Sequence, residues 1–473
     1  MSEIQMQNVV IKTFKTPLGY YVYDRETNSL LSVDEGAYYA FERIASGNDT
    51  EEDRKILSQY QKKGFCNETG LKEIRNNHVD VIDYHLKNKV KKITLQVTQN
   101  CNLRCGYCSY SGKYEQRTHT NNKMSFELMK KSVDFLMEHS VDVLEPVNIG
   151  FYGGEPLLEF ENIKKIIAYI GEEYPDKQIV YSMTTNGTLL NDSVLEFLTD
   201  HTFNIMISLD GPKEIHNQQR VFADGRGSFD TVMNNIRHVK EQYPKIFSSL
   251  SFNTVIAPES DYKCVHDFFN AKDVFEEDNS MSFGVVNPYN SKDSIRYDDK
   301  YYISSNYENV KILFSKLGIY NPDKTSKMLR SSFNKIRLFH DKLGKSVKMS
   351  HRGHPGGPCI PGVLRPFVDV NGNIFPCERV SEASNVMKIG HIDTGYEVEK
   401  IKKLLNIGEV TADECKKCWN FIHCGICGAA MDDLNELSRD KKLRECGWQK
   451  MDTLNKMKTI CLLKEYNYDF KEG

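Results

Sequence analysis

Apolar segments rich in β-forming residues alternate with amphipathic segments through the middle of the chain. The amphipathic stretches, such as SFELMKKSVDFLMEH and FDTVMNNIRHVKEQY, carry apolar residues at the three-to-four spacing of helices. Strands joined by such helices form a parallel sheet. Six strand–helix units predict an α/β fold, a partial (β/α)6 barrel. The predicted strands are KITLQVT from residue 92, VNIGFY from 147, QIVYSMTT from 178, FNIMISL from 203, SSLSFNTVI from 248 and MSFGVV from 281.

Other patterns flank this region. Near the N-terminus, YYVYDRETNSLLSV alternates about the polar turn 25–28, which predicts a hairpin. Asp34 and Thr50 are suited to cap two helices that end near Ala45 and Gly64. A polar Tyr-rich and Lys-rich segment with one or two helices follows the barrel, and the turn RGHPGGPCIPG opens the last region. We therefore predict a β-then-α module over 1–88, the barrel over 89–300, a bridge over 301–350 and a cysteine-rich domain over 351–473.

Composition narrows the class of protein. A net charge of −3 argues against a nucleic-acid binder that works through a broad basic face. The N-terminus lacks an apolar signal run, and no apolar stretch approaches the ~20 residues that span a bilayer, so we expect a cytoplasmic protein without a membrane segment. In a reducing cytoplasm the thirteen cysteines are expected to serve metal binding or catalysis rather than structural disulfides.

Chemically active residues follow four of the predicted strands, at the carboxyl ends where parallel α/β proteins bind ligands. Three thiolates on one loop can hold three irons of a cubane cluster and leave the fourth iron open. The glycines after the second strand let the backbone approach a ligand, and the neighbouring glutamate can receive an ammonium group. The residues are Cys101, Cys105 and Cys108 after the first strand, Gly153, Gly154 and Glu155 after the second, Thr184, Thr185 and Asn186 after the third, and Ser208 and Asp210 after the fourth.

The motifs CX3CX2C, GGEP, TNGT and SLDGP, in this order, resemble the radical S-adenosylmethionine (SAM) superfamily over about 200 residues. The resemblance implies that the three cysteines bind a 4Fe–4S cluster whose open iron is chelated by SAM. An electron from a donor such as flavodoxin or ferredoxin then cleaves SAM, and the 5′-deoxyadenosyl radical abstracts a hydrogen atom from the substrate. The implied cofactor-binding residues are Tyr107 beside the adenine, Glu155 at the methionyl amine, Ser208 and Asp210 near the ribose, Arg220 at the carboxylate, and Gly153, Gly154 and Asn186 around them.

A second cysteine group reads CX17C and then CX2CX5CX2C, with a last cysteine 18 residues further on. It resembles the SPASM extension of radical enzymes that modify peptides, which binds two auxiliary 4Fe–4S clusters and would bring the total to three. The usual pattern has three residues between the last two cysteines of the run, whereas this chain has two. A pair of zinc ribbons is the alternative. Carried over by position, Cys415, Cys418, Cys424 and Cys446 complete one cluster, and Cys359, Cys377 and Cys427 serve the other.

The second of these clusters is one protein ligand short. Its free iron is expected to be open to a substrate thiolate, and the alternative is that His351 or His354 fills the position. Glu378 falls where sulfatase-maturing relatives carry an aspartate thought to deprotonate the substrate, so it is a candidate catalytic residue or else an ordinary neighbouring carboxylate. Three cysteines lie outside both groups and are expected to be buried apolar residues: Cys66, Cys264 and Cys461.

The N-terminal module resembles the recognition element fused to enzymes that modify ribosomally made peptides. Such a winged-helix-like domain accepts a leader peptide as an added strand. The alternatives are a structural cap on the barrel and a DNA-binding winged fold, and the absence of a basic recognition helix argues against DNA.

Together these resemblances imply a cytoplasmic peptide maturase of the sactipeptide or ranthipeptide type, which joins cysteine sulfur to a carbon of a precursor peptide through a thioether. Carbon–carbon cross-linking and formylglycine-type oxidation are alternatives on the same scaffold, and the N-terminal module argues against a sulfatase-maturing role. A zinc-binding regulatory protein is the alternative of another class.

Overall fold

The barrel contains all six predicted strands in parallel. The computed structural model describes residues 9–271, 275, 279–344, 349–357 and 359–471, so the predicted module and bridge include residues 1–8 and 345–348 that lie outside the described residues. The strands pair in chain order, from β5 at one side to β10 at the other. They are β5 (Lys92–Thr98), β6 (Val147–Gly153), β7 (Ile179–Thr185), β8 (Phe203–Ser208), β9 (Ser251–Ile256) and β10 (Ser280–Val285).

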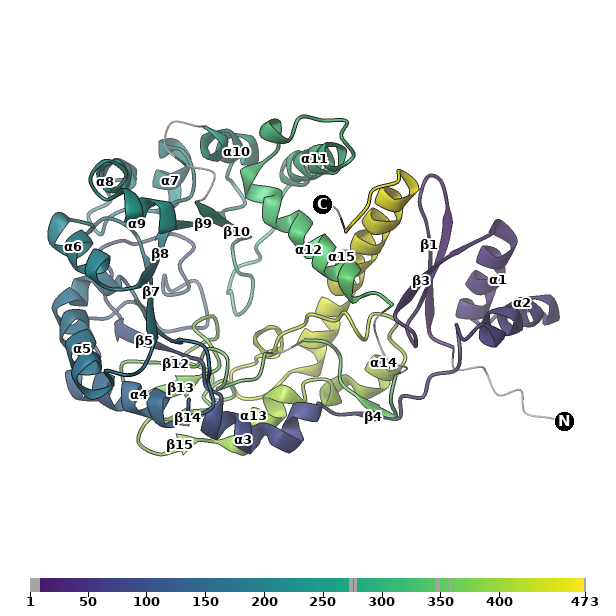
Figure 1. The fold of residues 1–473 in the computed structure, drawn as a ribbon, viewed down its shortest axis with the longest axis horizontal. Coiled ribbons are helices and arrows are strands. Elements are labelled where there is room, and N and C mark those ends of the chain that lie inside the picture. The colour runs from purple at the N-terminus through teal and green to yellow at the C-terminus, as the bar shows by residue number, and fades with distance from the viewer. Residues whose placement is uncertain (1–8, 272–274, 276–278, 345–348, 358, 472–473) are drawn as a thin grey trace.

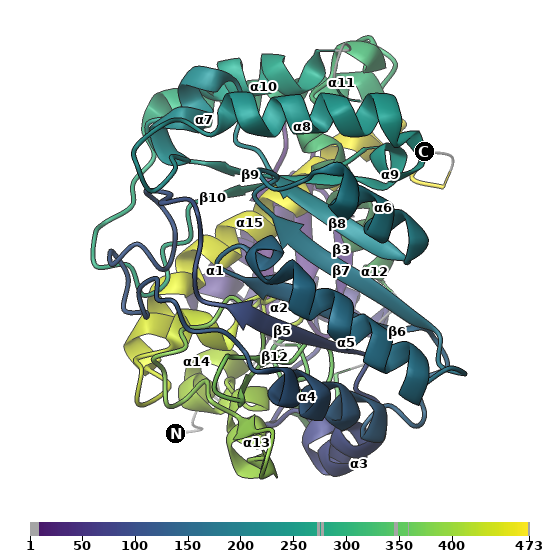
Figure 2. The same cartoon turned by 90° about the vertical axis from the view of Figure 1, so that its left-hand side faces the viewer.

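Helices cover the outer face of this sheet, as Figure 2 shows. Each presents one apolar side to the strands, for example Ile163, Ile166 and Ile170 of α5, which are buried. β9 begins three residues later than expected because Pro244 opens a short helix in front of it. The helices are α4 (Phe126–Glu138), α5 (Phe160–Glu173), α6 (Asp192–Asp200), α7 (Lys213–Gln219), α8 (Phe229–Gln242), α9 (Pro244–Ser249) and α10 (Tyr262–Asn270).

The cysteine-rich region extends the same sheet. β12 (Phe367–Val368) pairs parallel with β5, and β13 (Asn373–Phe375), β14 (Gly390–His391) and β15 (Gly395–Tyr396) continue antiparallel, which gives a sheet of ten strands. These strands of two or three residues carry no readable alternation, so the sequence pattern did not predict them. Cys377 lies two residues after the end of β13, so this pairing places it beside the barrel.

The N-terminal module is a three-stranded antiparallel sheet with two helices. The predicted hairpin is β2 (Tyr20–Asp24) and β3 (Ser29–Val33), and β1 (Ile11–Lys15), which was not predicted, pairs with β2. The two predicted helices are α1 (Glu35–Ser46) and α2 (Glu51–Lys62), and both predicted caps are present. Asp34 accepts a hydrogen bond from the Ala37 amide at 2.9 Å, and Thr50 forms a capping box with Asp53.

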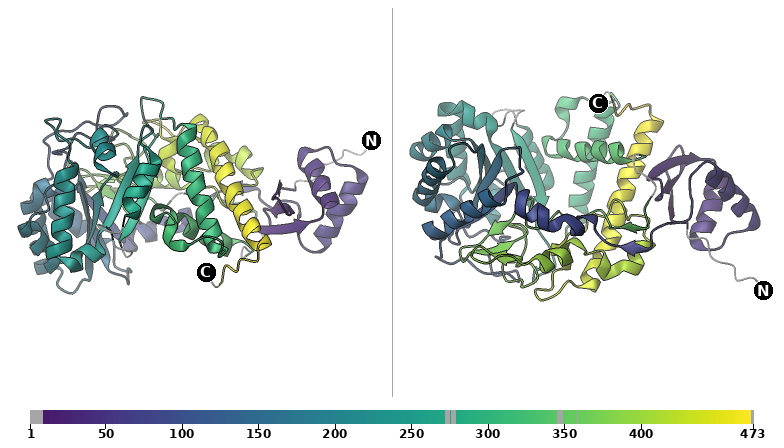
Figure 3. Two further views of the ribbon diagram at one scale, coloured as in Figure 1. Left: turned by 90° about the horizontal axis from the view of Figure 1, so that it is seen from above. Right: turned by 60° about the horizontal axis from the view of Figure 1, so that its bottom comes forward.

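This small sheet is buried on both faces. One face packs on α1 and α2 through Val22, Phe41 and Leu57, and the other packs on the C-terminal helices through Phe14 and Tyr23. Figure 1 shows the sheet between these layers, and Figure 3 shows the module at one end of the molecule, away from the barrel. The helices of the second layer are α12 (Arg330–Lys342) and the long α15 (Arg439–Glu465).

The tip of the hairpin is buried against the cysteine-rich region. The Arg25 side chain is 0% exposed, and its Nη1 donates a hydrogen bond to the Lys416 carbonyl at 2.6 Å. Arg25 Nη2 pairs with Glu26 Oε1 at 2.8 Å, and His423 donates to Asn28 Oδ1 at 2.7 Å. The polar turn of the predicted hairpin is therefore the anchor between the N-terminal module and the cysteine-rich region.

The remaining elements are short or connect these parts. Among the described residues, no helix is long and apolar enough to cross a bilayer. The elements are β4 (Glu73–Ile74), which pairs with β11 (Arg352–Gly353), and the helices α3 (Ile82–Asn88), α11 (Asp299–Lys316), α13 (Val398–Leu405) and α14 (Ala412–Lys416).

Candidate functional site

The loop after β5 carries three half-buried thiols. Burial raises the pKa of Cys101 to about 12 and that of Cys105 to about 11, and it also raises the pKa of Cys108. The Sγ atoms of Cys101 and Cys108 accept hydrogen bonds from the amides of Leu103 at 3.3 Å and Tyr110 at 3.5 Å. A thiol must lose its proton to bind a metal, and burial opposes this loss. The two amide donors act in the other direction, because they stabilise the thiolate.

Cations surround this loop. The guanidinium groups of Arg220, Arg117 and Arg104 oppose the effect of burial on the pKa of Cys108. Three neighbouring thiols with amide donors and cations nearby fit an anionic iron–sulfur cluster. Among the described residues, no three His, Cys, Asp or Glu side chains close on a single point as they would around one metal ion.

Gly153 and Gly154 allow a close contact within the protein itself. A Cβ on Gly153 would lie 2.1 Å from the Thr98 carbonyl oxygen, and one on Gly154 would lie 1.9 Å from that of Asn100. The amides of Gly154 and Glu155 donate to these same carbonyls, each at 2.9 Å. The glycines therefore let the end of β6 lie against the start of the cluster loop, and their approach to a ligand stays a prediction.

Glu155 lies in a buried cradle at the end of β6. Its carboxylate accepts hydrogen bonds from the Asn186 amide at 2.7 Å, the Thr185 hydroxyl at 2.7 Å and the Leu157 amide at 3.2 Å. Burial nevertheless raises its pKa to about 7. The side chain of Asn186 reaches the cluster loop and donates to Asn102 at 2.8 Å, so both residues tie the strand ends to the loop.

Asp210 is the centre of a buried group after β8. Its Oδ2 accepts hydrogen bonds from the Tyr107 hydroxyl at 2.5 Å and from Arg220 Nε at 2.8 Å, while Oδ1 accepts from the Val255 amide at 3.0 Å. The Arg220 guanidinium also lies 5.5 Å from the centre of the Tyr107 ring. The structure thus brings three predicted cofactor residues together, with Ser208 buried two positions before Asp210. The contacts of Asp210 are to protein, so its direct effect is to hold Tyr107 and Arg220 in place.

His216 supports this group in its neutral form. Its Nδ1 accepts the Asp210 amide at 3.3 Å, its Nε2 lies 2.9 Å from the Ser228 hydroxyl, and burial lowers its pKa to about 4. In the unfolded chain the imidazole gains a proton below about pH 6.5, whereas in the folded protein it stays neutral. The stability that His216 contributes is therefore complete above pH 6.5 and is lost as the pH falls toward 4.

We accordingly expect the free energy of unfolding in urea to fall between pH 6.5 and 4, and to fall less steeply in His216→Gln. The two slopes should differ by up to about 1.4 kcal/mol per pH unit, which is the effect of one proton. His78→Gln, which changes an exposed histidine, is the control and should keep the wild-type slope. Equal slopes for all three proteins would contradict this assignment.

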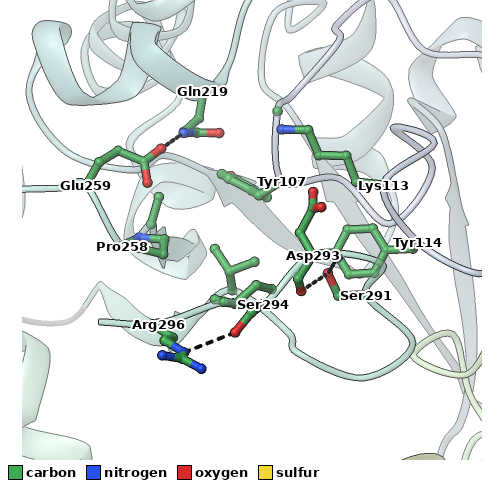
Figure 4. Close-up of a pocket in the computed structure, with 14 residues that line it drawn as sticks. Tyr107, Lys113, Tyr114, Gln219, Pro258, Glu259, Ser291, Asp293, Ser294 and Arg296 are labelled. Atoms are coloured by element: carbon green, nitrogen blue, oxygen red, sulfur yellow. Dashed lines mark hydrogen bonds between the residues drawn. The ribbon is translucent and has the colours of Figure 1, made fainter. Parts of the chain in front are cut away.

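A cavity of about 330 Å³ opens beside Tyr107 (Figure 4). Figure 4 shows Gln219 donating to Glu259 on one side, with Asp293 and Arg296 on the other. Glu259 and Asp293 follow β9 and β10, the fifth and sixth strands. The rule that located the other site residues at strand ends would have found them, because it applies to every strand of the barrel. The volume is that of a small-molecule site.

Glu382 is another buried residue that the sequence analysis missed. Its carboxylate accepts hydrogen bonds from Gln96 at 2.7 Å, Tyr110 at 2.8 Å and Arg117 at 2.7 Å. Gln96 belongs to β5 and Tyr110 follows the last cysteine of the cluster loop. Glu382 thereby joins the cysteine-rich region to the cluster loop across the inside of the barrel.

Thiols of the second cysteine group lie near one another. Burial raises the pKa of Cys424 to about 11 and also raises that of Cys446, and the nearby Cys415 and Cys418 add to the effect. Burial likewise raises the pKa of Cys359 and Cys377, with a further contribution from Cys427. The assignment of these cysteines to two clusters, which the resemblance implied, stays a prediction.

His351 and His354, the alternative fourth ligands, both make hydrogen-bond contacts to other groups. His354 Nε2 accepts the Gly408 amide at 2.8 Å and Nδ1 lies 2.8 Å from the Pro355 carbonyl, so both ring nitrogens are engaged. His351 is exposed, and its Nδ1 lies 2.8 Å from the Gly70 carbonyl. Glu378 lies 3.5 Å from Arg365 and 3.7 Å from Arg379.

The three remaining cysteines differ from one another. Cys66 and Cys461 are buried among apolar side chains, as expected. The prediction for Cys264 was wrong, because α10 presents it to solvent. A single position on an amphipathic helix can lie at the edge of its apolar face, which the sequence alone does not place.

Comparisons with known proteins agree with this geometry. Residues 95–270 match the radical SAM superfamily. A cysteine-type anaerobic sulfatase-maturating enzyme of Clostridium novyi is 28% identical over 74% of this chain and 83% of its own. The radical SAM cyclopropyl synthase TigE of Paramaledivibacter caminithermalis is 22% identical over 81% of this chain and 78% of its own.

A further relative and a solved structure mark the extent of the similarity. An uncharacterized protein of Methanocaldococcus jannaschii, MJ0907, is 34% identical over 29% of this chain, and the match spans less than half of that relative, 45%. The structure of native anSMEcpe with bound AdoMet and a Cp18Cys peptide superposes with a TM-score of 0.53 at 22% identity, covering 79% of this chain and 99% of that one. The barrel thus has the fold of this solved structure, and residues 95–270 are similar to the radical SAM superfamily.

Proposed function

We propose that the protein is a radical SAM enzyme that modifies a ribosomally made precursor peptide and joins a cysteine sulfur of that peptide to a carbon through a thioether. The observation that carries the proposal is the three-cysteine set of Cys359, Cys377 and Cys427, in which Cys427 lies close enough to the other two to affect their pKa values. A set one ligand short leaves a position for a thiolate from the substrate.

The loop after β5 is proposed to hold the SAM-binding cluster. Bound there, the cluster and SAM would supply the radical chemistry that removes one hydrogen atom from the acceptor carbon. The thiol proton would pass to a base and the remaining electron to the cluster of the three-cysteine set, which accounts for the two hydrogens lost. Tyr107, whose hydroxyl is held by Asp210, lines the neighbouring cavity, which suits the nucleoside part of SAM. The buried carboxylate of Glu155 is placed to receive the amine.

Glu378 is proposed to act on the substrate thiol. It follows Cys377 directly, its side chain is 19% exposed, and two arginines fix its position. A carboxylate beside the open position of the three-cysteine set can accept the thiol proton or hold the peptide.

The N-terminal module is proposed to bind the leader of the precursor. In the sheet order β1-β2-β3, β3 is an edge strand, so its outer backbone groups are available to pair with an added strand. Because the hairpin tip is anchored by Arg25, a leader on this edge would be held at a fixed position relative to the cysteine-rich region.

Carbon–carbon bond formation is the second candidate. TigE, which matches over most of this chain, is named a cyclopropyl synthase. In that case the three-cysteine set would not bind the substrate, and the peptide would keep its free thiols.

Co-expression of the enzyme with the short peptide encoded beside its gene tests the proposal. Mass spectrometry should show the loss of two hydrogens per cross-link, and the modified cysteine should no longer react with iodoacetamide. The Cys427→Ala variant should lose this product, whereas Cys264→Ala, which changes the exposed cysteine outside both groups, should retain it. A precursor without cysteine, or a product whose thiols all remain reactive, would refute thioether formation.

A further inference from the structure

Lys442 is a buried lysine inside the cysteine-rich region. The residue is 1% exposed, whereas lysines are almost never fully buried without a partner. Its Nζ donates a hydrogen bond to the Ile407 carbonyl and lies 4.0 Å from Cys415 Sγ. Within the described ranges, no ion pair joins Lys442 to a carboxylate, and nearby Glu414 is paired with Arg439.

Thiols occupy the place where a counter-charge would be expected. Cys424 and Cys446 also lie close enough to attract the charge of Lys442. Lys442 and Cys446 are four residues apart on α15, so they share one face of the helix, and the Cys446 thiol lies 3.6 Å from the Lys442 carbonyl. One helix therefore delivers both a thiol and a cation to the same site.

A buried ammonium group is costly unless an anion compensates it. Protonated thiols carry no charge, whereas thiolates that ligate an iron–sulfur cluster give it a net negative charge. The positive charge of Lys442 is therefore compensated when the cluster is present and uncompensated when it is absent.

We propose that Lys442 is the counter-ion of an iron–sulfur cluster held by Cys415, Cys418, Cys424 and Cys446, and that it raises the reduction potential of this cluster. A nearby positive charge stabilises the reduced form, which is the more negative of the two. The inference rests on the proposed assignment of these cysteines to an auxiliary cluster and does not depend on the peptide product.

The three-cysteine set has a different electrostatic environment. Its nearby cation, Arg365, is 37% exposed and lies 3.5 Å from Glu378, so solvent and a carboxylate offset its charge. The two auxiliary clusters should therefore differ in potential, and the one beside Lys442 should be the more easily reduced.

A redox titration of the reconstituted protein, followed by electron paramagnetic resonance, tests the inference. The titration uses a background in which Cys101, Cys105 and Cys108 are alanine, so that only the auxiliary clusters contribute. In Lys442→Met the equilibrium constant for reduction of one of the two clusters should fall tenfold, which lowers its reduction potential by 59 mV for a one-electron couple. The potential of the other cluster should be unchanged. Lys441→Met is the control, because the Nζ of this neighbouring lysine binds Asp432 and Asp433 instead.

The thermal stability of the iron-free protein provides a second measurement that also applies if Lys442→Met binds iron poorly. A counter-ion that has lost its cluster is an uncompensated buried charge, so iron-free Lys442→Met should melt at a higher temperature than the iron-free wild type. A lysine that only supports the fold would give the opposite result. An unchanged potential, a lower melting temperature of the iron-free variant, or zinc in place of iron at these cysteines would each overturn the inference, whether or not thioether activity is found.

Discussion

Gly154→Ala is expected to prevent assembly of the site after β5. The added Cβ would lie 1.9 Å from the Asn100 carbonyl oxygen and 2.9 Å from the Cys101 amide nitrogen. Both are backbone atoms, so no side chain can move to relieve the overlap. The segment that leads into Cys101 must shift, and the hydrogen bonds that the amides of Gly154 and Glu155 make to it are lost.

We expect this variant to lose on the order of 3 kcal/mol or more in unfolding free energy and to bind less iron after reconstitution. Urea denaturation and iron analysis measure the two effects. Gly171→Ala is a matched control, since Gly171 lies in α5 and a Cβ there meets nothing within 4 Å. It should be neutral or more stable by about 0.5–1 kcal/mol. Wild-type iron content and stability in Gly154→Ala would show that the strand end and the loop are not in contact.

Arg25→Met is expected to have the second large effect, through the anchor between the N-terminal module and the cysteine-rich region. The substitution removes the hydrogen bond to the Lys416 carbonyl and leaves the buried Glu26 without its partner. Removal of one partner of a buried ion pair costs about 3–5 kcal/mol. Because Lys416 lies between Cys415 and Cys418, this variant should also retain less iron.

The double variant Arg25→Met/Glu26→Gln separates charge from contact. With both charges removed, most of the lost unfolding free energy should return, because a buried neutral pair carries no uncompensated charge. Urea denaturation of the two variants makes the comparison, and limited proteolysis after α2 reports whether the module has detached. If Arg25→Met costs less than about 1 kcal/mol, as an exposed pair would, the hairpin tip is not the anchor.

Much of the fold could be predicted because its signals are local. The six strands of the barrel, the hairpin at β2 and β3, and the caps Asp34 and Thr50 each follow from a few neighbouring residues. β1 and the short strands β12 to β15 were missed. β12 pairs with β5, far earlier in the chain, whereas β1 and β13 to β15 pair with strands close to them in sequence. The alternation within such short segments carries too little information to reveal them.

The candidate site divides in the same way. The order of the strand-end motifs located Cys101, Glu155 and Asp210, because parallel strands bring their carboxyl ends to one edge. It could not show that Asp210 accepts hydrogen bonds from Tyr107 and Arg220. Tyr107 and Asp210 are 103 positions apart in sequence, and only the folded barrel brings them into contact. Glu382 was missed for the same reason, as its partner Tyr110 lies 272 positions away.

The sequence by itself determined where the chemically active residues lie along the chain: a cysteine loop at the end of a parallel strand, a glycine-rich turn and an acid at the next, and a second group of cysteines. These features consist of the order and spacing of residues along the chain, which can be read directly from the sequence. Only the tertiary structure decided that Gly153 and Gly154 admit the chain's own backbone, that the tip of the N-terminal hairpin is buried, and that Lys442 has thiols as its neighbours. Burial and charge balance are set by groups that are distant in sequence, and their free energies depend on which of those groups the fold brings into contact.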